Sequence, residues 1–129
     1  MPKKAIVFGV FDKLHEGHKH FLVDAARECD KLTVVLARAK AVKILKKRPP
    51  KQSFNARKKA ILKFNPRLHV VPSEHTIGTW KILDRLKPDM VLLGYDQKEI
   101  ARELKKRGIV YKFLDPFRPG KFKSSLTRS

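Results

Sequence analysis

The organisation of this chain follows from residues 8–18, which read FGVFDKLHEGH. The residues just before and at its start, 5–8, form a continuous apolar run, which is typical of a parallel strand covered on both faces. From Gly17 to Cys29, apolar residues recur at three- and four-residue spacing, as in an amphipathic helix packed on a sheet. The stretch is therefore predicted to be the loop that joins a buried strand to a helix.

This loop has the features of a binding site for phosphate. Open α/β sheets bind ligands beyond the carboxyl ends of their strands, and the free N–H groups at a helix N-terminus favour anions. His15 and His18 are three residues apart at the helix entry, so both imidazoles can offer a hydrogen-bond donor to one anion. Gly17 lies between them and lets a nucleotide approach the backbone, because glycine has no Cβ.

Other interpretations of the two histidines stay open on spacing alone. A histidine near a helix start can cap the helix or lie on the surface without binding anything. A zinc site is disfavoured, because the helix lacks two histidines at i and i+4 with the intervening glutamate of a metalloprotease. Cys29 is also the only cysteine, so no resident metal is expected.

The net charge of +19 is the main feature of the composition. It makes nucleic acid, anionic lipid and phosphorylated small molecules all plausible partners. The sequence has no RNA-recognition signature, zinc-finger spacing or GXXG loop, so RNA is indicated by charge only. No apolar run reaches the roughly 18 residues of a membrane span, and a single cysteine is typical of a reducing cytoplasm.

The remaining sequence alternates between strands and helices. Strands are predicted at 31–37, 69–71, 90–94 and 109–113, and helices at 53–65, 79–86 and 98–107. Residues 38–52 are treated as a basic connection, and the strand at 69–71 is placed at an edge because Pro72 follows it. Five strands alternating with four helices predict a Rossmann-like, doubly wound, five-stranded parallel sheet in a single domain covering residues 1–129.

The motif Gly9-Val10-Phe11-Asp12-x-x-His15-x-Gly17-His18 resembles the HxGH signature of the cytidylyltransferase-like nucleotidyltransferase superfamily. That superfamily includes glycerol-3-phosphate cytidylyltransferases, pantetheine-phosphate adenylyltransferases and FAD synthases, and the strongest likeness is to the small archaeal-type FAD synthase and cytidylyltransferase group. The resemblance implies that the motif residues bind a nucleotide. It also implies catalytic roles for the two histidines. At Val10 the sequence departs from many relatives, which have a phosphate-binding hydroxyl at this position.

The same resemblance extends to positions further along the chain. Lys46 lies in the basic connection, where the family has a phosphate-binding lysine, so the resemblance implies a catalytic role for it, although a solvated loop would look the same. Gly94 and Asp96 belong to a segment with which relatives contact the nucleoside, and Asp96 is also placed to cap the following helix. Arg57 matches the arginine of a family helix motif but is equally consistent with a surface residue.

The last residues of the chain complete the implied site. Arg118, Ser124 and Ser125 resemble the arginine and the serine-rich segment that hold the triphosphate in this superfamily, although a short basic tail often frays. Mg²⁺ is implied with the nucleotide, and Asp12 either holds it through water or only braces the loop. Relatives often form homodimers.

The implied reaction transfers a nucleotidyl group from an NTP to a phosphorylated acceptor and releases pyrophosphate. The Gly94–Gln97 segment and the basic connection look most like FAD synthase, which uses ATP and FMN. The alternative is a cytidylyltransferase that uses CTP and glycerol 3-phosphate or a similar phospho-alcohol. An alternative of a different class is a non-catalytic basic domain associated with RNA.

Overall fold

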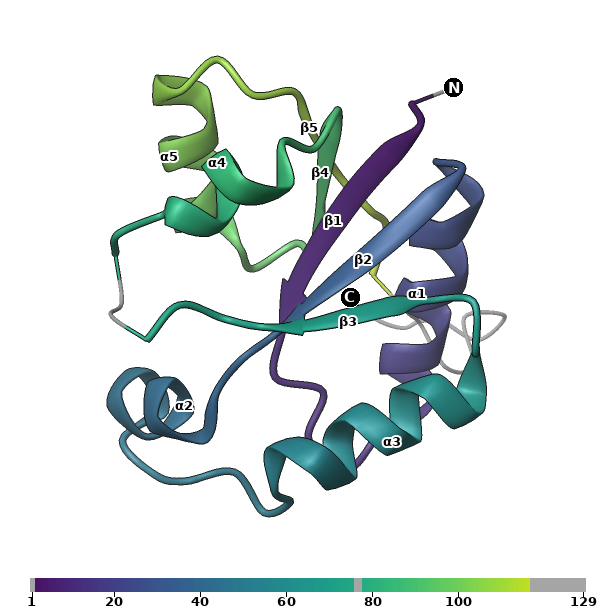
Figure 1. Cartoon of the computed structure of the whole chain (residues 1–129), viewed down its shortest axis with the longest axis vertical. Coiled ribbons are helices and arrows are strands. Elements are labelled where there is room, and N and C mark those ends of the chain that lie inside the picture. Colours follow the sequence, from purple (N-terminus) through teal and green to yellow (C-terminus); the bar gives the residue numbers. More distant parts are fainter. Residues whose placement is uncertain (1, 76–77, 117–129) are drawn as a thin grey trace.

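The computed structural model describes residues 2–75 and 78–116, and a parallel β-sheet lies at its centre (Figure 1). Its five strands are ordered β3-β2-β1-β4-β5. They are β1 (Lys4–Gly9), β2 (Lys31–Leu36), β3 (His69–Pro72), β4 (Met90–Leu93) and β5 (Tyr111–Phe113). Every neighbouring pair is parallel. The predicted fold class is confirmed, as are the pairing of the first two strands and the edge position of β3.

Helices cover both faces of this sheet. On one face, α1 (Glu16–Arg27) and α3 (Phe54–Phe64) pack through Leu22 and Ile61 against Val7. On the other, α4 (Lys81–Leu86) and α5 (Lys98–Lys106) pack against Ile6 and its neighbours, as the separation of α4 and α5 from α1 in Figure 1 shows. Adjacent residues of β1 thus point to opposite cores, which explains the continuous apolar run in the sequence.

The basic connection contains a helix that the sequence analysis did not predict. Helix α2 (Ala39–Lys46) makes a fifth helix among the described residues, where four were expected. Its residues are mostly strong helix formers, and Ala41 and Val42 are buried. Its C-cap is Lys47, which adopts a left-handed conformation with φ 60°, shortly before two prolines that cannot continue a helix. The alternation of strands and helices is therefore correct, but the second crossover contains two helices.

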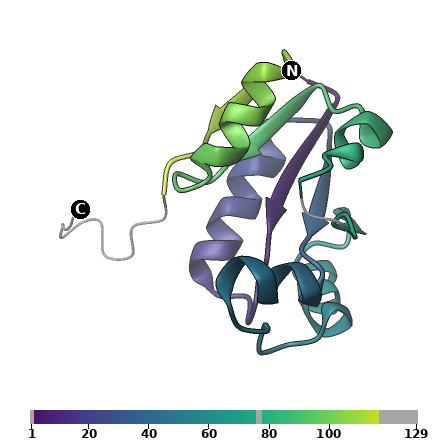
Figure 2. The ribbon, with the colours of Figure 1, turned by 90° about the vertical axis from the view of Figure 1, so that its left-hand side faces the viewer.

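The strand order fixes where a ligand can bind. The chain runs from β1 outward to β2 and β3, and then returns to the other side of β1 for β4 and β5. The crevice between the carboxyl ends of β1 and β4 is thus the topological switch point of the sheet, the usual binding position in this architecture. Figure 2 shows that α2 and α3 lie at the end of the molecule toward which the strand arrows point.

Candidate active site

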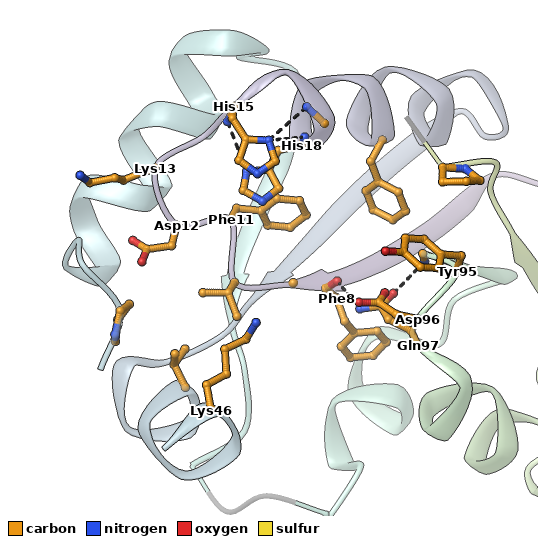
Figure 3. A pocket seen from close by; sticks show the side chains of 18 of the residues that line it. Phe8, Phe11, Asp12, Lys13, His15, His18, Lys46, Tyr95, Asp96 and Gln97 are labelled. Atoms are coloured by element: carbon orange, nitrogen blue, oxygen red, sulfur yellow. Dashed lines mark hydrogen bonds between the residues drawn. The ribbon is translucent and has the colours of Figure 1, made fainter. Parts of the chain in front are cut away.

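A cavity of about 1000 Å³ opens at the switch point (Figure 3). The β1–α1 loop, the end of α2 with the connection that follows it, the loop after β4 and the residues after β5 form its walls. It brings together every predicted site residue that lies within the described part of the chain: Gly9, Val10, Phe11, Asp12, His15, Gly17, His18, Lys46, Gly94 and Asp96. Arg118, Ser124 and Ser125 lie outside the described residues.

Each of the two histidines uses one ring nitrogen to cap the start of α1. His15 is the N-cap, and its Nδ1 accepts hydrogen bonds from the backbone N–H groups of Gly17 (3.1 Å) and His18 (3.4 Å). In return, the Nδ1 of His18 accepts from the backbone N–H of His15 (3.3 Å). The rings stack with their centroids 3.7 Å apart. Because each Nδ1 accepts, this network assigns the ring proton to Nε2 in both residues.

This geometry unites two interpretations that the sequence left open. Capping uses only the Nδ1 atoms, so each ring keeps an Nε2–H donor for a ligand. Burial lowers the pKa of His18 to about 4, helped by the adjacent His15 and by Lys46 and opposed by the carboxylate of Asp12. His18 is therefore neutral at physiological pH, and it offers a ligand a hydrogen bond rather than a positive charge.

The position of the Phe11 ring explains why the first residue of the motif is glycine. Phe11 is buried, has a φ of 47°, and folds its ring back over Gly9. A Cβ at Gly9 would lie 2.5 Å from this ring, so no other residue fits without moving it. The same ring packs edge-on against His18, with centroids 5.3 Å apart. Glycine at position 9 thus leaves room for the Phe11 ring, which in turn packs against the proposed catalytic residue His18.

Asp12 connects the motif loop to the segment that follows α2. Its carboxylate oxygens accept the backbone N–H groups of Lys51 (2.7 Å) and Gln52 (2.9 Å). The backbone N–H of Lys13 donates to the Gln52 side chain at 2.8 Å. Burial acts to raise the pKa of Asp12, but the two N–H donors and the charges of Arg57 and Lys13 hold it below the ordinary value of 3.8. The sequence suggested that Asp12 either holds Mg²⁺ through water or braces the loop, and these contacts support the bracing role.

Arg57 is a supporting residue that the sequence analysis left undecided. It is fully buried, so the interpretation as a surface residue is wrong. Its Nη1 donates to the carbonyls of Val10 (3.1 Å) and Ala37 (2.7 Å), and its Nε donates to that of Gln52 (3.2 Å). The helical pattern contained a signal, because Arg57 falls on the apolar face of α3 at four residues before the buried Ile61.

Gln97 holds together the two strand ends that border the switch point. Its Nε2 donates to the carbonyl of Phe8 and its Oε1 accepts the N–H of Gly94, both at 2.9 Å. Gln97 is also the N-cap position of α5, so Asp96 does not cap this helix. Asp96 instead lies exposed in the lining of the cavity. The sequence pattern alone did not identify Gln97 as a site residue.

Cations surround one side of the cavity. Lys46, the last residue of α2, lines it together with Lys13, Arg48 and Lys51. No acidic side chain forms an ion pair with these four cations in the described part of the chain. Nor do three metal-ligating side chains come together within residues 2–75 and 78–116. The arrangement suits a ligand with several negative charges.

Comparisons with known proteins agree with this site. A family model described as cytidylyltransferase-like matches residues 6–128. An FAD synthase of Aciduliprofundum boonei is 37% identical over 113 residues, which cover 84% of this chain and 74% of the relative.

None of the helices among the described residues is both long and apolar enough to span a membrane.

Solved structures show the same fold. The lipopolysaccharide core biosynthesis protein of Thermoplasma volcanium is 29% identical, with a TM-score of 0.75 covering 92% of this chain and 100% of that one. A bifunctional NMN adenylyltransferase/ADP ribose pyrophosphatase of Francisella tularensis, complexed with AMP and a manganese ion, is 16% identical. Its TM-score is 0.61 over 92% of this chain and 38% of that one, which shows the fold alone.

The motif loop, the switch-point cavity, the family match over most of the sequence and the identity to an FAD synthase all agree. This chain belongs to the cytidylyltransferase-like family of nucleotidyltransferases.

Proposed function

We propose that this enzyme is an FMN adenylyltransferase, which transfers AMP from ATP to the phosphate of FMN and releases pyrophosphate. The observation that carries the proposal is the pair of stacked histidines at the switch point, of which His18 is neutral, with a cluster of cations on one side of the same cavity. The similarity to FAD synthases supports the choice of ATP and FMN.

The chemistry requires positioning and charge stabilisation rather than a covalent intermediate. A phosphate oxygen of FMN attacks the α-phosphorus of ATP in line with the departing pyrophosphate, and negative charge builds on the non-bridging oxygens. The Nε2–H groups of His15 and His18 donate to these oxygens. Lys46 and the proposed contact from Arg118 neutralise the outer phosphates, and the hydroxyls of Ser124 and Ser125 are proposed to donate hydrogen bonds to them. Removal of one such donor typically costs on the order of 10²–10³ in rate.

The loop after β4 is proposed to hold the nucleoside. Gly94 follows β4 directly, and Gln97 fixes its backbone against the end of β1. This leaves the exposed carboxylate of Asp96 in the cavity lining, where it can accept hydrogen bonds from a ribose hydroxyl or a base amino group.

Mg²⁺ is proposed to enter as part of the MgATP substrate. Asp12 fits a supporting role toward it, because each carboxylate oxygen accepts one backbone N–H and keeps a lone pair for a metal-bound water. The metal would neutralise phosphate charge. A cytoplasmic location and a homodimer are further proposals, which rest on the cysteine content and on the resemblance to the family.

The test is a panel of substrate pairs with pyrophosphate release as the readout. ATP and CTP are each offered FMN, glycerol 3-phosphate, phosphopantetheine and nicotinamide mononucleotide. We expect release with ATP and FMN, and its loss in His18→Asn, while the exposed His69→Asn on β3 serves as the matched control. Release only with CTP and glycerol 3-phosphate would replace the proposal by the cytidylyltransferase alternative.

A further inference from the structure

One long segment of the chain carries only positive charge. Residues 31–73, which span β2, α2, α3 and β3, contain no aspartate or glutamate. They contain Lys31, Arg38, Lys40, Lys43, Lys46, Lys47, Arg48, Lys51, Arg57, Lys58, Lys59, Lys63 and Arg67. All ion pairs found among residues 2–75 and 78–116 join side chains outside this segment. Within the described part of the protein, none of these cations forms an ion pair, and Asp12 is the acidic residue whose charge acts on Arg57.

Two of these cations share one exposed face of α3 with an asparagine. Asn55, Lys59 and Lys63 are spaced four residues apart and all are exposed, so they share one face of the helix at intervals of about 6 Å along its axis. The exposed cations Lys51 and Arg67 flank the helix in the sequence, just before and just after it. We call these five residues the α3 ridge. Figure 1 shows α3 running along the lower edge of the molecule.

The opposite face of α3 is committed to the core. Ile61 is buried, and Phe54 and Phe64 pack against the same cluster. Residues 51–73 include no exposed large apolar side chain, and the exposed apolar side chains of the 31–73 segment, Ile44 and Leu45, belong to α2 rather than to α3. A helix that binds a bilayer surface inserts an apolar face into it, so the α3 ridge lacks the anchor that a membrane requires. A line of cations and an amide instead matches a linear polyanion in water.

We infer that the α3 ridge binds the phosphate backbone of a nucleic-acid strand without sequence preference, in addition to the nucleotidyl transfer proposed above. Lysine, arginine and asparagine side chains are common donors to backbone phosphates. Like charges four residues apart on a helix destabilise it, and contact with phosphates relieves that repulsion while releasing condensed counterions. Lys51 also lines the catalytic cavity, so the bound strand extends from the cavity mouth along α3.

The test compares two variants of equal charge. Lys59→Gln/Lys63→Gln/Arg67→Gln removes three cations of the α3 ridge, and Lys98→Gln/Lys105→Gln/Lys106→Gln removes three exposed lysines of α5. Each lowers the net charge from +19 to +16. Binding is measured by fluorescence anisotropy with a short labelled RNA and with DNA of the same sequence, at about 50 and about 200 mM salt.

We expect the α3 ridge variant to bind about 10-fold or more weakly at low salt, with a slope of log K against log salt that is shallower by about 2. The α5 variant should stay within about twofold of the unmodified protein. Binding to RNA, DNA or both supports the inference and names the strand. Equal weakening by both variants, no binding, or ridge-dependent binding to phosphatidylserine vesicles alone would overturn it. The assay contains neither ATP nor FMN, so its outcome is independent of the proposed catalysis.

Discussion

At the entry to α1, His15 and His18 each serve the fold with one nitrogen and leave the other for a ligand. The Nδ1 atoms accept backbone N–H groups of the first helical turn, and the ring protons are assigned to Nε2. Helix stability and the proposed catalysis therefore depend on different atoms of the same side chain, and suitable substitutions can separate them.

His18→Asn is the substitution that makes this separation. The Oδ1 atom of asparagine can replace Nδ1 as the acceptor for the His15 N–H, but asparagine has no group that reaches the position of Nε2. We expect kcat to fall by about 10²–10³ while Tm changes little. Steady-state kinetics and thermal unfolding check this, and an unchanged kcat would show that the Nε2–H donor takes no part.

The depressed pKa of His18 predicts a pH dependence of stability. In the unfolded chain His18 takes up a proton near its ordinary pKa of 6.5, whereas in the folded protein it does so only near 4. The unfolded state thus binds more protons between these values, so the free energy of unfolding should fall as the pH is lowered from about 6.5 toward 4.

Urea unfolding at pH 7 and pH 5 measures this effect. We expect His18→Asn to lose less stability over that interval than the unmodified protein, because the residue that resists protonation is gone. Asp12 does not interfere, since its pKa lies below 3.8 and outside the interval. Equal losses in the two proteins would contradict the assignment.

At the level of elements, the connection after α2 is held to the motif loop by hydrogen bonds of two side chains. Asp12 holds the backbone of Lys51 and Gln52, and the buried Arg57 joins Gln52 to Val10 and Ala37. This arrangement positions the cations of the second crossover beside the histidines. The family resemblance implied that both segments bind phosphate, but it did not specify which side chains join them.

Arg57→Met should test how much this junction contributes to stability. Methionine retains much of the buried volume but leaves the three carbonyls without their charged donor. We expect the free energy of unfolding to fall by about 3 kcal/mol. Lys59→Met, on the exposed face of the same helix, should change it by less than about 0.5 kcal/mol. Chemical denaturation of both variants decides, and similar small changes would rule out a structural role for Arg57.

Substitution of Lys46 tests whether helix α2 contributes a phosphate contact to the proposed active site. Lys46 lines the cavity, whereas Lys43, one turn earlier on α2, is not among the lining residues. We expect Lys46→Ala to reduce kcat/KM for ATP by about 10-fold or more, consistent with the loss of a phosphate contact. Lys43→Ala should remain within about twofold in the same assay. A comparable loss in both variants would mean that general charge, not position, attracts ATP.

Helix α2 itself illustrates the limit of sequence patterns for short elements. It has eight residues, no side-chain cap hydrogen bond and no acidic residue in its first turn, so the usual start signals are missing. The two prolines after it indicated where a helix must stop, but not that one had begun. Tertiary packing of Ala41 and Val42 stabilises it instead.

For the whole molecule, the sheet was predictable because its signals are strong and mutually consistent. Apolar strand segments at 5–8 and 90–94 alternate with amphipathic helices, and the right-handed crossover rule then leaves few topologies. That topology places residues 9–18 and 94–97 at one switch point although about 80 residues separate them. Burial of a single arginine and the tautomers of two histidines depend on the packed structure and lie beyond such rules.

The most direct test of the account follows the α-phosphate of ATP. The protein is incubated with α-³²P-labelled ATP and FMN, and the products are separated by chromatography. We predict that the label moves into FAD with an equal amount of pyrophosphate, and that His18→Asn slows this transfer by about 10²–10³. If no labelled FAD forms, or if His18→Asn forms it as fast as the unmodified protein, the proposed adenylyl transfer at the histidine pair is wrong.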